Sequence, residues 1–132
     1  MNVEDISRIQ GSLEIKLPDQ YCRMLANYPY PDAECRKLHL LGDADSIIQQ
    51  NTELRKSGYS GFDWPSGFIA IGHDGCGCIW FIQADDPRCN VYYADFNEDF
   101  PPPDPNYEFD DFVLRMAEAN PFDDGPLPIL KD

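Results

Sequence analysis

Residues 67–82 read GFIAIGHDGCGCIWFI and hold two apolar runs separated by a glycine-rich turn. The first run covers residues 68–71 and the second covers residues 79–82. Both are rich in β-branched and aromatic side chains, which pack well on a pleated sheet, and both are shorter than an ordinary helix. The stretch therefore predicts a β-hairpin. Because neither run alternates between apolar and polar residues, both strands are expected to be buried on much of both faces, at the centre of a sheet.

Two further runs extend this sheet. Residues 90–94, NVYYA, are rich in strand-forming side chains and follow DDPR at residues 85–88, a sequence typical of a loop. A short connection between consecutive strands is the commonest one, so the three central runs predict an antiparallel meander. Residues 37–41, KLHLL, predict a short additional strand at an edge.

Four segments carry apolar residues at the spacing of three and four that marks one face of a helix. They cover residues 2–14, 17–28, 46–56 and 108–119. Gly11 lowers the helix propensity of the first segment by about 1 kcal/mol relative to alanine, so it is a candidate end of that helix. The last segment has an apolar stripe made of Phe109, Phe112, Val113 and Met116.

Capping signals mark the ends of the second and third helices. Pro18 suits a first helical position, where its missing N–H costs nothing, and Pro29 stops the helix. Asp43 or Asp45 can cap the third helix, and Gly58 stands where a C-terminal glycine belongs. These signals predict helices that are separate from the strands on either side.

The predicted order is helix, helix, strand, helix, three strands, helix. Since consecutive strands lie at the centre and helices lie toward both chain ends, we expect an α+β fold with an antiparallel sheet and the helices packed on one face. A doubly wound parallel sheet would need alternating strands and helices, which the hairpin contradicts. Residues 1–132 are expected to form a single domain, with the proline-rich residues 120–132 as a C-terminal tail.

Charge is the strongest compositional signal. The 24 acidic residues exceed the 10 basic ones and give a formal net charge of -14. Residues 84–132 hold 13 of the acids and 3 of the bases. A surface of this kind repels nucleic acid and anionic membranes and attracts basic partners. We therefore expect binding to neither nucleic acid nor membrane, while the acidity serves either a protein partner or solubility alone.

Acidic and aromatic residues are interleaved in the loops around the third central run. Exposed aromatic side chains among like charges suit a protein interface better than a purely solvated surface. The candidate partner-binding residues are Asp85, Asp86, Asp95, Phe96, Glu98, Asp99, Phe100, Asp104 and Tyr107. The alternative is that the aromatic side chains pack into the core and the acids only keep the protein soluble.

Cysteine and histidine residues are the candidates for catalysis or metal binding. Cys76 and Cys78 are separated by one residue, whereas structural zinc sites use wider pairs, and no nucleophile motif surrounds any cysteine. We expect no catalytic residue, metal or cofactor; a hydrolase or metal enzyme using His73 with Cys76 and Cys78 is the weakest alternative. Five scattered cysteines and an acidic N-terminus without an apolar signal segment predict a cytoplasmic protein.

Three segments also carry a family pattern. They are LPDQY at residues 17–21, FIAIG at residues 68–72 with VYYAD at residues 91–95, and FDDFV at residues 109–113. In this order and spacing the chain resembles the SUKH superfamily, which includes a fungal cell-wall-synthesis regulator and many bacterial immunity proteins. It departs from the pattern at Tyr28 and Pro29, where relatives often have Asn-Gly, and at Cys78, where many have an acid.

The resemblance implies an α+β fold, no catalysis, and a cytoplasmic protein that binds and neutralises a cognate toxin. Many such toxins are nucleases, which carry basic surfaces to hold phosphates. The alternative implied by the fungal relatives is a regulatory or scaffold module that binds signalling proteins. The toxin's identity and the choice between monomer and homodimer stay open.

Overall fold

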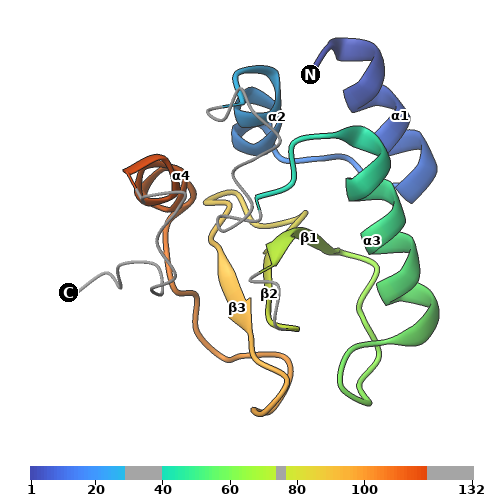
Figure 1. The fold of residues 1–132 in the computed structure, drawn as a ribbon, viewed down its shortest axis with the longest axis vertical. Helices are drawn as coiled ribbons and strands as arrows, with labels where there is room; N and C mark the ends of the chain where they lie inside the picture. Colours follow the sequence, from blue (N-terminus) through green and yellow to red (C-terminus); the bar gives the residue numbers. More distant parts are fainter. Residues whose placement is uncertain (29–39, 74–76, 119–132) are drawn as a thin grey trace.

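The computed structural model describes residues 1–28, 40–73 and 77–118. Within these ranges the chain forms four helices and three strands (Figure 1). They are α1 (Val3–Leu13), α2 (Asp19–Ala26), α3 (Ala44–Ser57), β1 (Phe68–His73), β2 (Ile79–Gln83), β3 (Tyr92–Ala94) and α4 (Phe109–Glu118). The predicted α+β class is confirmed. The predicted tail at residues 120–132 lies outside the described residues.

The three strands form one antiparallel sheet in the order β1-β2-β3, which confirms the meander. Ile69 lies opposite Ile82, and Phe81 lies opposite Tyr92. The register of β1 shifts by one residue between positions 70 and 72. Of the strand predicted at residues 37–41, residues 37–39 lie outside the described residues, and Leu40 forms an isolated bridge with Gly72.

The sheet buries apolar side chains on both faces. One face packs against the helices, with a shared core that includes Ile69, Ile71, Trp80 and Ile82 from the strands and Ile9, Tyr21, Ile47 and Phe112 from α1, α2, α3 and α4. The other face packs mainly against loops, with a second core of Ala70, Ile79, Phe81, Ala94, Tyr59, Trp64, Phe100 and Leu54. Helices therefore cover one face, as predicted, and aromatic residues from two loops cover the other.

The outer edge of β1 is covered by hydrogen bonds from elsewhere in the chain. The fully buried Asn51 of α3 donates from Nδ2 to the carbonyl of Ala70 at 3.0 Å and accepts from the Ala70 N–H at Oδ1 at 2.8 Å. Trp64 Nε1 donates to the Phe68 carbonyl at 3.1 Å. An uncovered edge would offer its backbone groups to another strand. Asn51 thus closes the sheet at its β1 side.

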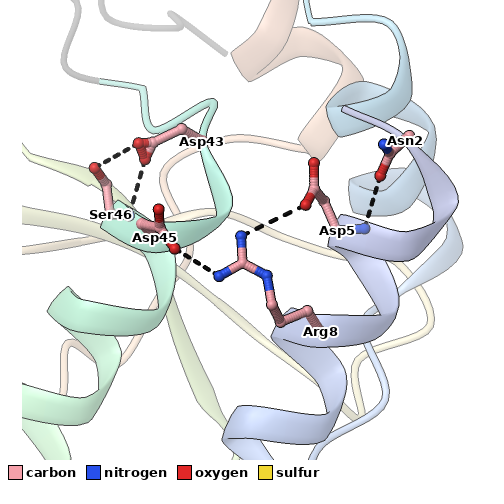
Figure 2. A network of polar contacts seen from close by, with 6 residues as sticks. All are labelled: Asn2, Asp5, Arg8, Asp43, Asp45 and Ser46. Atoms are coloured by element: carbon pink, nitrogen blue, oxygen red, sulfur yellow. Dashed lines mark hydrogen bonds and ion pairs between the residues drawn. The ribbon is translucent and has the colours of Figure 1, made fainter.

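Acidic side chains at the start of α1 and α3 cap α3 and form an ion pair between the two helices. Asp43 Oδ1 accepts a hydrogen bond from the Ser46 N–H at 2.8 Å, so Asp43 is the N-cap of α3. Arg8 of α1 bridges Asp45 at 2.5 Å and Asp5 at 3.5 Å (Figure 2). Because Arg8 and Asp45 are exposed, solvent screens this bridge and it is expected to contribute little to stability.

Two predicted helix boundaries change. Helix α1 continues through Gly11 to Leu13, and Glu14 follows in a left-handed conformation with φ of 53°. The helical segment predicted at residues 2–14 is therefore confirmed, and the candidate end at Gly11 is not used, because burial of Ile9 and Leu13 against the core outweighs the low propensity of one glycine. Pro18 is the N-cap of α2 and not its first residue, and α2 ends at Ala26.

Tyr21→Phe should leave the free energy of unfolding unchanged or raise it by up to about 1 kcal/mol. Tyr21 is fully buried, and its hydroxyl has no hydrogen-bond partner in the part of the chain that the structure describes. Burial also raises its pKa, so the hydroxyl stays protonated. Urea unfolding measures the difference. Tyr59→Phe is the matched control and should lose about 1–2 kcal/mol, since the Tyr59 hydroxyl lies 2.8 Å from the Gly77 carbonyl.

Candidate functional site

The structure divides the predicted partner-binding residues between two ends of the sheet. Ile79, at the start of β2, lies opposite Ala94, at the end of β3. Asp85 and Asp86 belong to the connection between these strands and so lie at the other end, near α2 (Figure 1). Residues 95–99 follow β3 directly, beside the start of β2. The nine residues therefore do not form one continuous patch.

The end that carries Asp85 and Asp86 has mixed charge. Asp86 shapes the turn itself, because Oδ1 accepts from the Arg88 N–H at 3.0 Å and Oδ2 accepts from the Asn90 N–H at 3.0 Å. Asp85 and Asp86 line a shallow groove of about 490 Å³ whose wall also includes Lys16 and Arg23. Positive charge beside the two aspartates reduces their pull on a basic partner.

Phe100 and Tyr107 are core residues. Their side chains are 7% and 6% exposed. Phe100 stacks on Trp64 with ring centroids 5.4 Å apart, and Tyr107 packs against Trp80 and Phe112. The expectation that both side chains are exposed among the acids is wrong, because each completes one of the two apolar cores. They support the loops and do not reach the surface.

Phe96 is exposed, and the structure adds a second exposed aromatic beside its loop. Phe96 and Phe62 are 46% and 43% exposed. Phe62 ends a tight turn in which its N–H and carbonyl pair with those of Tyr59 at 2.9 and 2.7 Å. Ser60 and Gly61 between them have φ of 50° and 84°, as in a type I′ turn. Ser60 Oγ donates to the Phe96 carbonyl at 3.0 Å, which joins the two loops.

Gly77, which lies just before β2, is close to both loops. The Tyr59 hydroxyl lies within hydrogen-bond distance of the Gly77 carbonyl at 2.8 Å and the Ala94 carbonyl at 2.9 Å. Gly77 has φ of 99°, and a Cβ there would lie 3.3 Å from the Phe96 ring. A glycine at position 77 thus permits the backbone conformation and the close approach of the ring. The loops at residues 58–63 and 95–99 therefore both approach Gly77, the first through the Tyr59 hydroxyl and the second through the Phe96 ring.

We call this surface the acidic aromatic end. Its residues are Phe62, Asp63, Asp95, Phe96, Glu98 and Asp99. Between residues 57 and 114 the sequence has a single lysine or arginine, Arg88, which lies in the turn at the opposite end of the sheet. Within the described residues, the two ion pairs both involve Arg8 of α1. Among the described residues, none of the acids at this end takes part in an ion pair.

The acids of this end do different work. Asp95 Oδ1 accepts from the Asn97 N–H at 2.9 Å and the Asp95 carbonyl accepts from the Glu98 N–H at 3.0 Å, so Asp95 shapes its loop. Asp63, Glu98 and Asp99 are exposed. Asp104 is close enough to Tyr92 on β3 to affect its ionisation. Burial raises the pKa of Tyr92 most, and the charges of Asp86 and Asp104 raise it further.

Sequence reasoning missed Phe62 and Asp63. Phe62 directly precedes Asp63, and an acid as immediate neighbour is the same local signal that made Phe96, which follows Asp95, a candidate. What no local signal contains is the contact between the two loops. That contact depends on the Ser60 and Tyr59 side chains reaching backbone carbonyls far along the chain.

Of the described cysteines, Cys78 and Cys89 are buried and Cys22 is partly exposed. Cys78 and Cys89 are 6% and 0% exposed. Burial raises the pKa of Cys89 to about 12, with Asp86 as the next cause, so its thiol is protonated and poorly nucleophilic at neutral pH. Cys76 lies outside the described residues. Among those that are described, no group of three or more histidine, cysteine or acidic side chains could hold a metal ion.

None of the described helices combines the length and the apolar character that crossing a bilayer requires.

The family comparison agrees with the fold. The model of the SMI1/KNR4 family (SUKH-1) matches residues 1–118, from before α1 to the end of α4. The chain belongs to this family. No curated protein and no solved structure matches it.

The SUKH-1 segments noted in the sequence are mainly core-forming. Leu17 and Tyr21 of LPDQY, Ile69 of FIAIG, and Phe109 and Phe112 of FDDFV are all at most 2% exposed. These residues therefore carry the SUKH-1 fold. Most of the acidic aromatic end lies outside the three segments.

Proposed function

We propose that this SUKH-1 protein is a cytoplasmic, non-enzymatic immunity-type protein that binds and neutralises a cognate toxin with a basic surface. Membership of the SMI1/KNR4 family supports a protein-binding role of the immunity or regulatory kind. The observation that carries the toxin-binding proposal is the acidic aromatic end, where exposed phenylalanines stand among acids that form no ion pair within the described residues.

The physical basis is charge complementarity. A nuclease holds phosphates with lysine and arginine, and an acidic protein surface can occupy the same groups. Long-range attraction also speeds association, which matters because a toxin must be captured before it acts. A net charge of -14 strengthens this attraction and gives the complex a strong dependence on salt.

The test is co-expression of the tagged full chain with the toxin domain encoded beside its gene, followed by purification and kinetic measurement. We expect a one-to-one complex and loss of toxicity. The triple variant Asp95→Asn, Glu98→Gln, Asp99→Asn should slow association about tenfold at low salt, because steering is lost. Asparagine at position 95 keeps the oxygen that accepts from the Asn97 N–H.

A matched variant removes the same charge elsewhere. Glu4, Glu14 and Glu53 are exposed on or beside α1 and α3, and their replacement by glutamine should change association much less. Equal association rates for the wild-type chain and the triple variant at low salt would contradict the use of this surface. Absence of any toxin complex would contradict the proposed function itself.

A regulatory or scaffold module is the alternative, because the SUKH superfamily also includes a fungal cell-wall-synthesis regulator and this chain belongs to its SMI1/KNR4 family. Capture of signalling proteins from the native cell by the tagged chain, with no toxin among them, would favour this second function.

A further inference from the structure

We infer that Phe62 and Phe96 are paired apolar anchors, and that they fit a partner protein surface with an apolar pocket ringed by lysine or arginine. The inference deepens the proposed function, since it names the contact residues and the chemistry of the toxin surface. It also applies to any other basic protein partner of the same chain.

Exposure distinguishes this pair. Four large apolar side chains are well exposed in the described chain: Val3, Phe62, Phe96 and Leu114. Val3 and Leu114 lie on the separate helices α1 and α4. Phe62 and Phe96 instead lie on loops that a hydrogen bond joins, so two rings occupy one end of the molecule. Aromatic side chains, phenylalanine among them, are enriched in the cores of protein interfaces.

The two loops are held in shape before any partner binds. The turn at residues 59–62 is closed by two backbone hydrogen bonds, and the Tyr59 hydroxyl ties it to Gly77 and Ala94. The Phe62 ring packs against Phe100 of the second core with centroids 6.3 Å apart. Loops that are ordered in advance lose less entropy on binding, which favours affinity.

Charge identifies the occupant. Asp63, Glu98 and Asp99 are exposed on the same two loops. A second copy of this chain would bring the same acids against them, and nucleic acid would bring phosphates, so both are repelled. A basic protein surface complements the acids at the rim while its apolar pocket covers the rings, which is the usual division between the core and rim of an interface.

Two synthetic peptides of equal length and equal lysine content test the anchors without any toxin. One alternates lysine with leucine at helical spacing, and the other replaces every leucine with serine. At low salt the full chain should bind the lysine–leucine peptide more tightly. The double variant Phe62→Ala, Phe96→Ala should lose at least about tenfold of that affinity and bind the lysine–serine peptide unchanged.

The double variant Val3→Ala, Leu114→Ala is the matched control, because it removes two exposed apolar side chains from other elements of the chain. It should bind both peptides as the wild-type chain does. Urea unfolding of both double variants verifies that each is folded. If the phenylalanine variant binds the lysine–leucine peptide as tightly as the wild-type chain, the inference is overturned.

The toxin measurement separates this inference from the proposed function. A toxin complex whose affinity survives Phe62→Ala, Phe96→Ala would overturn the anchors and leave the immunity function standing. Peptide binding that depends on the two phenylalanines, with no toxin complex, would support the anchored surface and reject the immunity function.

Discussion

Replacing Asn51 with leucine should lower the free energy of unfolding by about 4 kcal/mol. Asn51 is fully buried in α3, and its amide satisfies both the N–H and the carbonyl of Ala70 on β1. Leucine has a similar volume but no polar atoms, so both groups of the buried Ala70 would be left without partners. Each unsatisfied buried group costs about 1–3 kcal/mol.

Urea-induced unfolding followed by tryptophan fluorescence gives the change in stability. Thr52→Ala is the control, since residue 52 is exposed on the same helix and its replacement should change stability by less than about 0.5 kcal/mol. The leucine variant should also aggregate more readily, because the edge of β1 loses part of its cover. A loss below about 1 kcal/mol for Asn51→Leu would contradict the assigned role.

Gly58→Ala should cost about 3 kcal/mol. Gly58 ends α3 with φ of 75° and ψ of -172°, a backbone conformation that is essentially restricted to glycine. An added Cβ would also lie 2.4 Å from the carbonyl oxygen of Phe62, a backbone atom that cannot move without opening the turn at residues 59–62. The variant is therefore expected to lose stability and to displace Phe62 together.

Gly11→Ala is the matched control for this substitution. Gly11 lies within α1 with nothing within 4 Å of an added Cβ, so alanine should stabilise the protein by up to about 1 kcal/mol. The same denaturation experiment applies to both variants. The changes in the free energy of unfolding should have opposite signs for the two variants. No change for Gly58→Ala would show that Gly58 and the turn at residues 59–62 are less constrained than their geometry indicates.

The variants Gly58→Ala and Asn51→Leu should also differ in their effect on peptide binding. Gly58→Ala should lower the affinity for the lysine–leucine peptide more than the affinity for the lysine–serine peptide, since the substitution moves the Phe62 ring and leaves the charge of the protein unchanged. Asn51→Leu acts on the β1 edge and should change neither peptide's affinity as long as the protein is folded. The contrast separates the support of the loops from the stability of the fold.

Much of the fold follows from local pattern. The apolar runs at residues 68–71 and 79–82 became β1 and β2, and Asp43 and Gly58 became the caps of α3. In each case the deciding interaction lies within a few residues of the signal: a turn, a cap, or one apolar face. The local pattern left two possible ends for the first helix, Gly11 and the end of the apolar stripe, and burial of Leu13 against the distant core decides for the later one.

The candidate site followed the sequence less closely. Acidity and interleaved aromatics are properties of composition, and they pointed to the region after β3. Composition could not decide whether Phe100 and Tyr107 are buried, because each side chain fills a core assembled from distant segments of the chain. Separation of Asp85 from Asp95 depends on the direction of β3, which carries the chain from one end of the sheet to the other.

By itself, the sequence determined the α+β class, the antiparallel meander, the helix caps and the net charge, because periodicity, turn chemistry and composition are local or additive. Only the tertiary structure decided which aromatic side chains face solvent and which acids lie together. Phe62 and Phe96 share one surface because Ser60 and Tyr59 hydrogen-bond to carbonyls of Phe96 and Ala94. Contacts of this kind depend on how the strands are placed in space, and no local pattern encodes them.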